Sequence, residues 1–160
     1  KYSLTADFLG GVMLDGYEVY GDPVDTVITN TQLLALNATP ISVLAAPGAG
    51  KANVFKGAVL FYDYVTTACG GVAAGEDLVF KYTDGSGEQV SPQVETTGFI
   101  DQSADELRWV GPLSTDAAIS DVEPVANAAI VIQLLIGEVA TCSGDDLTVR
   151  VFYQTIPSTL

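Results

Sequence analysis

The chain contains no histidine, and its few charged residues are mostly acidic. Histidine is the commonest general base and metal ligand, so its absence excludes the serine and cysteine triads that need an imidazole. Lys and Arg number 6 against 20 Asp and Glu, which gives a formal net charge of −14, and the bases form no cluster. Such a surface repels phosphate and anionic lipid, so we expect no nucleic-acid partner.

Long hydrophobic runs are also lacking. None exceeds about ten residues, whereas a bilayer-spanning helix needs about 20, so we expect no membrane partner. The chain begins at Lys1 rather than Met, which we interpret as a processed or trimmed start, and no signal peptide is visible. Pro47–Lys51 lacks the full spacing of a phosphate loop and is followed by a predicted strand.

Neighbouring carboxylates are the remaining route to catalysis, because paired acids can hydrolyse glycosides without histidine. Asp105/Glu106, Asp121/Glu123 and Asp145/Asp146 are the candidate pairs. Each pair is expected in a loop or at a strand edge, where acids are ordinarily solvated. We therefore expect no enzyme, no catalytic residue, no cofactor and no metal ligand.

The residues that are abundant predict an all-β fold. Hydrophobic residues make up 48% of the 160 and charged residues 16%, against about 25% charged in a typical globular domain. Short apolar runs bounded by Gly, Pro or Asn are typical of buried strands. Eight such strands with regular turns indicate an antiparallel β-sandwich of jelly-roll type. The predicted strands are 32–36, 41–46, 53–64, 77–83, 88–96, 106–113, 128–136 and 146–155.

The first 25 residues differ from the rest and predict an irregular N-terminal arm, followed by the sandwich domain over residues 26–160. These 25 residues contain four glycines and four aromatic residues, and no period of 2 or 3.6 residues is sustained. This pattern fits either an arm that lies on a neighbouring subunit or a terminal segment packed on its own domain. If the arm reaches a neighbour, its aromatic residues Tyr2, Phe8, Tyr17 and Tyr20 are the interface candidates.

The two cysteines, Cys69 and Cys142, fall in predicted loops between the third and fourth and between the seventh and eighth strands. A jelly roll places these loops at the same end of the sandwich, so a disulfide is geometrically allowed. The alternative is a pair of free thiols in a reducing cytoplasm. A zinc site is disfavoured, because two cysteines without histidine or a nearby third ligand make a poor site.

Aromatic residues could form a carbohydrate platform. Tyr62 and Tyr64 are two residues apart and would share one face of a strand, with Tyr82, Tyr153 and Trp109 as further members. An aromatic stripe on a strand more commonly belongs to a core or an interface.

Residues 27–156 resemble a family of small tailed-phage virion proteins. The resemblance lies in the Ala-Pro-Gly-Ala-Gly-Lys turn of Ala46–Lys51, the strand end Tyr62-Asp63-Tyr64, and Gly75–Leu78 before the next strand. It implies a jelly-roll decoration or cement protein on the exterior of a capsid, assembled in the host cytoplasm. It also implies the major capsid protein as partner and self-association as a homotrimer.

Three classes of function therefore remain open. The first is a virion structural protein that decorates or cements a capsid. The second is a receptor- or carbohydrate-binding knob of a tail fibre, and the third is a surface-layer or pilus-like subunit. An arm that reaches another subunit favours the first class, an exposed aromatic groove the second, and strand donation between incomplete sandwiches the third.

Overall fold

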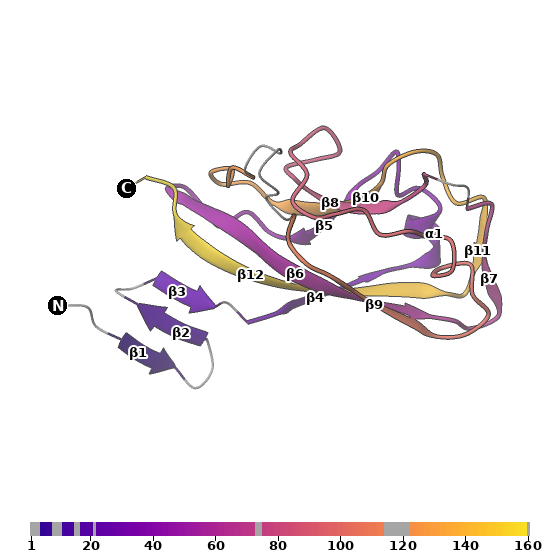
Figure 1. Cartoon of the computed structure of the whole chain (residues 1–160), viewed down its shortest axis with the longest axis horizontal. Helices are drawn as coiled ribbons and strands as arrows, with labels where there is room; N and C mark the ends of the chain where they lie inside the picture. Colours follow the sequence, from indigo (N-terminus) through magenta and orange to yellow (C-terminus); the bar gives the residue numbers. More distant parts are fainter. Residues whose placement is uncertain are drawn as a thin grey trace.

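A computed structural model of the chain describes residues 22–72, 75–113 and 122–159, together with the backbone of three strands before residue 21 (Figure 1). The strands are β1 (Leu4–Asp7), β2 (Gly11–Leu14), β3 (Tyr17–Tyr20), β4 (Val24–Ile28), β5 (Ile41–Leu44), β6 (Lys51–Asp63), β7 (Thr67–Gly70), β8 (Leu78–Tyr82), β9 (Glu106–Val110), β10 (Ile130–Leu134), β11 (Thr141–Ser143) and β12 (Asp146–Pro157). One short helix, α1 (Asn30–Leu33), lies between β4 and β5.

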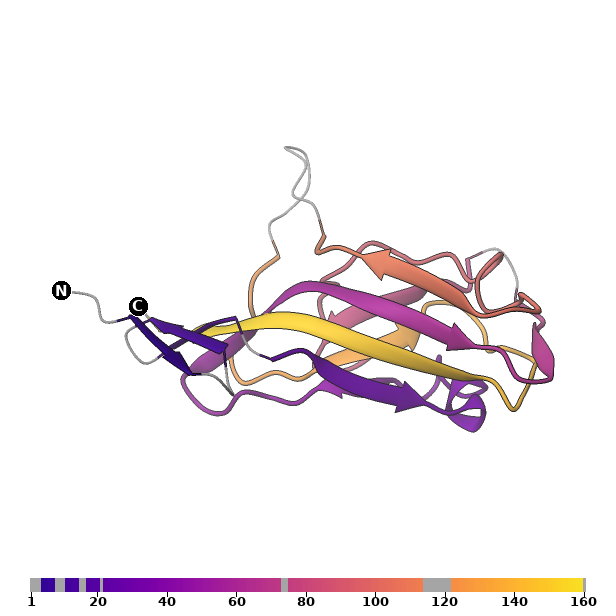
Figure 2. The ribbon, with the colours of Figure 1, turned by 90° about the horizontal axis from the view of Figure 1, so that it is seen from below.

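The sheets have the jelly-roll topology that the sequence predicts. One sheet has the order β4-β12-β6-β9 and the facing sheet the order β5-β10-β8, with antiparallel neighbours throughout. Residues 89–94 flank β8 through two isolated bridges. In chain order the eight strands of the sandwich are β4, β5, β6, β8, residues 89–94, β9, β10 and β12. The first of them pairs with the last, the second with the seventh, the third with the sixth and the fourth with the fifth. Figures 1 and 2 show the two layers.

A bulge in β6 determines which residues of that strand face the core. Phe152 lies opposite Gly57, and Tyr153 lies opposite Phe55, so Lys56 is the extra residue. An extra residue reverses the alternation of faces. Even-numbered Leu60 and Tyr62 therefore point inward after the bulge, whereas Phe55 points inward before it and stacks on Phe80 at 5.0 Å between ring centroids.

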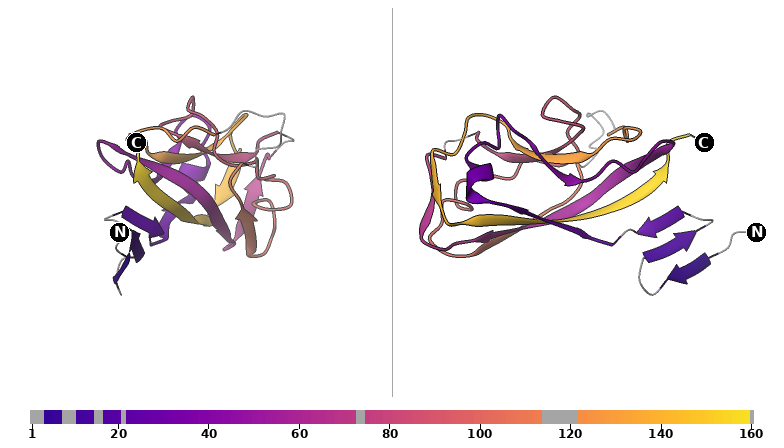
Figure 3. Two further views of the ribbon diagram at one scale, coloured as in Figure 1. Left: turned by 60° about the vertical axis from the view of Figure 1, so that its left-hand side comes forward. Right: turned by 180° about the vertical axis from the view of Figure 1, so that it is seen from behind.

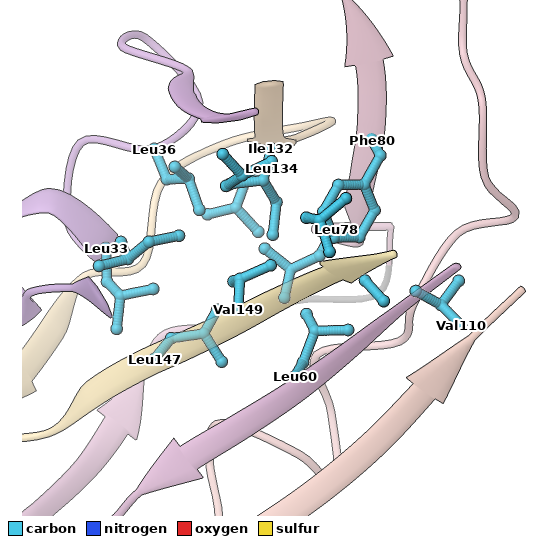
Figure 4. Close-up of a cluster of buried hydrophobic side chains, with 14 of the residues drawn as sticks. Leu33, Leu36, Leu60, Leu78, Phe80, Val110, Ile132, Leu134, Leu147 and Val149 are labelled. Atoms are coloured by element: carbon cyan, nitrogen blue, oxygen red, sulfur yellow. The ribbon is translucent and has the colours of Figure 1, made fainter. Parts of the chain in front are cut away.

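The core lies between the two sheets and is built from Leu, Ile, Val and aromatic side chains (Figure 4). Leu60, Leu147 and Val149 from one sheet meet Leu78 and Ile132 from the other, and all five are fully buried. Inward-facing side chains from both layers thus form one continuous hydrophobic cluster, as expected for aligned sheets.

The predicted strand over 32–36 is wrong, because Gln32 and Leu33 belong to α1 and residues 34–36 form turns. The Gln32 side-chain oxygen accepts a hydrogen bond from the Thr29 backbone N–H at 2.9 Å, a pairing typical of a capping box. Leu33 and Leu36, three residues apart, are both fully buried. Among the described residues no helix has both the length and the apolar character that crossing a membrane requires.

The predicted strand over 88–96 is only partly formed. Gln89 bridges Lys81 and Val94 bridges Leu78, but no regular ladder runs between them. Pro92 has no backbone N–H to donate, and the Ser91 hydroxyl oxygen accepts the hydrogen bond of Phe80 N–H at 3.1 Å. The segment accompanies β8 without forming a full edge strand.

Three segments predicted to be irregular form strands. β7 and β11 lie in the predicted loops 66–76 and 137–145 and pair with each other at one end of the sandwich. β1, β2 and β3 pair in order into a three-stranded N-terminal sheet within the segment expected to be an irregular arm. This sheet lies near the opposite end of the molecule from β7 and β11 (Figures 1 and 3). The domain division at residue 25 stays a prediction, and β4 begins before it, at Val24.

Replacing Leu60 by alanine tests the core. Leu60 is fully buried, whereas Leu107 on the neighbouring strand β9 is 59% exposed. Leu60→Ala should lower the free energy of unfolding by about 2–5 kcal/mol, and Leu107→Ala by less than about 0.5 kcal/mol, in urea denaturation. Equal effects for the two substitutions would contradict this assignment of faces.

Candidate binding surface

The outer face of the β4-β12-β6-β9 sheet carries two cross-strand rows of side chains. The register places Val27, Thr148, Phe61 and Leu107 in one row. The next row contains Asp25, Arg150, Val59 and Trp109. We call these eight residues together with Phe152 the outer face. Six of the nine are apolar, on a surface that an ordinary one-sided sheet would cover with polar residues.

Several apolar side chains of the outer face are open to solvent. Val27 is 55% exposed, Leu107 59% and Trp109 60%. They come from the two edge strands, while Val59 and Phe61 lie half-buried between them on β6. Large apolar side chains gathered on one face, rather than scattered singly, mark an interaction surface.

Trp109 is held in place by its neighbours. Its ring lies over Gly57, where an added Cβ would come within 2.7 Å of the indole Cη2 atom. Gly57 has φ of +146°, a region that favours glycine. Trp109 also contacts Phe152, which lies opposite Gly57 on β12, with the ring centroids 5.6 Å apart. The indole is therefore an ordered but exposed aromatic surface.

The charged residues of the outer face neutralise each other. Arg150 donates hydrogen bonds from Nε and Nη2 to the two carboxylate oxygens of Asp25 at 2.7 and 2.6 Å. These bonds hold the pKa of Asp25 below its ordinary value and raise the pKa of Arg150. A bidentate pair of this kind leaves the centre of the outer face without net charge.

Acidic residues border the outer face at one end. Asp63 and Asp146 lie directly opposite each other on β6 and β12, one row beyond Phe61 and Thr148. Like charges in such a pair repel each other. One oxygen of Asp146 accepts a hydrogen bond from the Asn30 N–H at 3.1 Å, whereas Asp63 is exposed. This border gives one end of the outer face a negative charge.

Cys69 and Cys142 form a disulfide that joins β7 to β11. The structure brings the two predicted cysteines together from segments 73 residues apart. Both are buried, and the disulfide closes the end of the sandwich opposite the N-terminal sheet. Of the two alternatives for the cysteines, a disulfide and a pair of free thiols, the structure has the disulfide.

A buried carboxylate supports the disulfide. Asp145 is fully buried and accepts hydrogen bonds from the Tyr62 hydroxyl at 2.8 Å and from the Val65 N–H at 2.6 Å. The Tyr62 hydroxyl in turn accepts a hydrogen bond from the Cys69 N–H at 3.3 Å. Burial first, and the hydrogen bond to Asp145 second, raise the pKa of Tyr62 well above its ordinary value.

The sulfurs of Cys69 and Cys142 and a carboxylate oxygen of Asp145 lie within 4.8 Å of one another, close enough for three ligands of one metal ion. Sulfur binds metals as a thiolate, and here both sulfurs are bonded to each other. The oxygens of Asp145 are also occupied by hydrogen bonds. The three residues therefore act together as a structural crosslink between β7 and β11, supported by the hydrogen bonds of Asp145.

The predicted interface aromatics fall at the edge of what the structure describes. Tyr2 and Phe8 lie outside the described residues. Tyr17 and Tyr20 are the first and last residues of β3, of which only the backbone is described. Their role at an interface stays a prediction.

The predicted carbohydrate platform is not formed as a unit. Tyr62 and Tyr82 are buried in the core, and the Tyr64 hydroxyl donates to the Thr66 carbonyl oxygen at 2.9 Å. Of the proposed members only Trp109 is largely exposed. Sequence reasoning missed Val27, Phe61, Leu107 and Phe152, because alternation alone does not tell which face of a strand is covered.

Four of the six carboxylates considered for catalysis accept hydrogen bonds or form an ion pair. Asp105 accepts a hydrogen bond from the Tyr64 N–H at 3.1 Å, and Glu106 forms an ion pair with Arg108 at 2.7 Å. Asp145 and Asp146 cap backbone N–H groups as given above. Glu123 is exposed, and Asp121 lies outside the described residues.

No protein-family model and no curated protein matches the chain. One solved structure, a family 6 carbohydrate-binding module from Clostridium cellulolyticum in complex with xylose, aligns at 11% identity over 97% of this chain and 86% of its own, with a TM-score of 0.27. A likeness this low carries no argument about ligand or role.

Removing the disulfide should destabilise the fold. Cys69→Ala/Cys142→Ala should lose about 2–4 kcal/mol of unfolding free energy in urea, because the closed loop no longer restricts the unfolded chain. Alkylation of the unmodified protein under denaturing, non-reducing conditions is the control, and it should label neither cysteine. Full labelling of both would contradict the disulfide.

The buried tyrosines should make stability fall at alkaline pH. The ordinary tyrosine pKa is 10.0, and burial raises the pKa of Tyr82 to about 12 and that of Tyr62 as well. Above pH 10 the unfolded chain releases these protons while the folded chain retains them, so stability falls as pH rises from about 10 to 12. Urea denaturation at several pH values should show this loss, and Tyr62→Phe/Tyr82→Phe should flatten it. An unchanged slope in the double variant would contradict the assignment.

Proposed function

We propose that this protein is a non-enzymatic structural subunit that decorates or cements a phage capsid, and that it binds the shell through the outer face. The observation that carries the proposal is the ordered, exposed apolar surface of Val27, Leu107 and Trp109 on a jelly-roll sandwich. The resemblance to small virion proteins supports the identity of the partner as the major capsid protein.

The charge distribution defines the partner more closely. The centre of the outer face is apolar and neutral, with Asp63 and Asp146 at its border, in a chain of net charge −14. A complementary surface has an apolar centre and basic groups along one side. A second copy of this face offers an acidic border where a complementary surface would carry basic groups, so the charge pattern favours a different protein as the occupant.

Location on the capsid exterior agrees with the disulfide. Disulfides are rare in a reducing cytoplasm and persist outside the cell. A subunit assembled in the host cytoplasm would carry Cys69 and Cys142 as thiols, and after the particle is released molecular oxygen would accept the two electrons and two protons lost as the S–S bond forms. Assembly in the cytoplasm is thus compatible with the disulfide between Cys69 and Cys142.

A tail-fibre knob that binds a receptor or carbohydrate is the second candidate function. Trp109 favours it, because an exposed indole beside Phe152 offers a flat surface on which a sugar ring could lie. The polar side chains needed to fix a sugar are limited, since Arg150 and Asp25 already bind each other. We therefore favour a protein surface over a sugar as the occupant.

Rebinding to native particles tests the proposed function. Particles stripped of this protein are mixed with purified chain, sedimented, and the bound fraction is measured. Leu107→Asp should weaken binding at least about tenfold, because the substitution would bury a charge within an apolar interface. Ile136→Asp is the matched control, since Ile136 is 65% exposed but lies beyond β10 on the facing sheet, and it should bind as the unmodified chain does.

Two results would overturn the proposal. One is unchanged binding of Leu107→Asp to stripped particles. The other is the absence of binding to capsids together with saturable binding of the unmodified chain to host-surface glycans, lost in Trp109→Ala, which would move the function to the tail-fibre class.

A further inference from the structure

The last residues of β12 form a sheet edge that no described strand completes. β12 pairs with β6 along its whole length, but on its other side β4 ends at Val24, opposite Val151. Beyond that point, Gln154–Pro157 have no ladder partner among the described strands on the side away from β6. An edge of this kind presents backbone N–H and C=O groups ready to pair with another chain.

This edge also lacks the features that proteins use to protect exposed edges. Gln154–Pro157 contains no charged residue, although the chain as a whole is strongly acidic, and only Pro157 at its end would obstruct pairing. The neighbouring Phe152 and Tyr153 favour extended structure as well. The segment is therefore suited to accept a strand.

The N-terminal sheet supplies a strand of matching position. β3 lies alongside β12, yet the two strands belong to different sheets. Each step toward the N-terminus from Val24 corresponds to one step toward the C-terminus from Val151. Continuing this register places Tyr17–Tyr20 opposite residues 155–158. The opposite edge of β3 is already paired with β2, so its remaining edge is the one available to β12.

We propose that the edge Gln154–Pro157 is a strand-addition site and that β3 of a second copy of this chain occupies it. A chain's own β3 lies beside this edge without a ladder to it, so β3 of the second copy pairs here by taking the place of that segment. Exchange of an identical segment between copies reproduces the same contacts in an oligomer. The four-stranded sheet of one copy then continues into the N-terminal sheet of the next.

Cysteine trapping between two full-length chains tests the exchange. One chain carries Val19→Cys and the other Ile156→Cys, the positions that the continued register places opposite each other. The two are mixed in denaturant, refolded together and mildly oxidised. We expect a disulfide between residues 19 and 156 of different chains, identified by mass spectrometry of the linked peptides, which also distinguishes it from the Cys69–Cys142 bond.

The observed β4–β12 ladder provides the matched control, because Val27 lies directly opposite Thr148 within one chain. A chain carrying both Val27→Cys and Thr148→Cys should close within itself, and a mixture of the single variants should give no inter-chain product. Light scattering of the unmodified chain should give at least twice the 16.7 kDa of a single chain, and a single-chain mass would contradict the exchange.

Two further outcomes would overturn the exchange. In one, a chain carrying both Val19→Cys and Ile156→Cys closes only within itself. In the other, the mixture of single variants gives no more inter-chain product than the Val27→Cys and Thr148→Cys mixture does. Neither measurement uses a capsid, so failure here is distinct from failure of the proposed function.

Discussion

The pairing of β6 with β12 is the interaction on which the rest of the structure depends. These two strands run side by side from Asp63 and Asp146 to Lys51 and Pro157 in the middle of the larger sheet. Every other strand of that sheet is positioned from this pair, with β4 on one side and β9 on the other. The ladder also continues past β4 and β9. It therefore determines which side chains face the core, which form the outer face, and where the edge at Gln154–Pro157 lies.

The bulge at Lys56 allows one long strand to serve two surfaces. Without it, the alternation that buries Leu60 and Tyr62 would turn Phe55 outward, away from Phe80. With it, Phe55 joins the core, Gly57 makes room for the Trp109 ring, and Phe61 remains on the outer face. The outer face and the core are thus consequences of the same irregularity, and a change there would disturb both.

The sequence predicted the strands whose apolar pattern is strong and missed those that depend on distant pairing. β12 alternates because it is buried on one side, and β6 is long, β-branched and aromatic. β7 and β11 are three or four residues long and exist because they pair across the disulfide, which no local pattern reveals. The helix had a local signal, the Thr29–Gln32 capping box, that the apolar run around Leu33 concealed.

The candidate surface was less accessible to sequence reasoning than the fold, for a physical reason. A strand with apolar residues on both faces predicts burial on both faces, and only the arrangement of layers shows that one face of β6 is left uncovered. Trp109 was recognised as an aromatic candidate, but its neighbours Phe152 and Gly57 come together with it through the register of three strands. Val27 and Leu107, at opposite edges of the same row, could be joined only once that register was known.

The outer face and the edge at Gln154–Pro157 require different properties of a partner, so one subunit can bind two kinds of partner. The outer face offers side chains and an acidic border, so it selects a partner by shape and charge. The edge at Gln154–Pro157 offers backbone groups without charge, so it accepts any strand of suitable register, and the chain's own β3 is the strand placed beside it. A subunit that uses the edge for copies of itself keeps the outer face available for a different protein. Both surfaces lie on the β6–β12 ladder, so the direction of these strands relates a partner on the outer face to a partner at the edge.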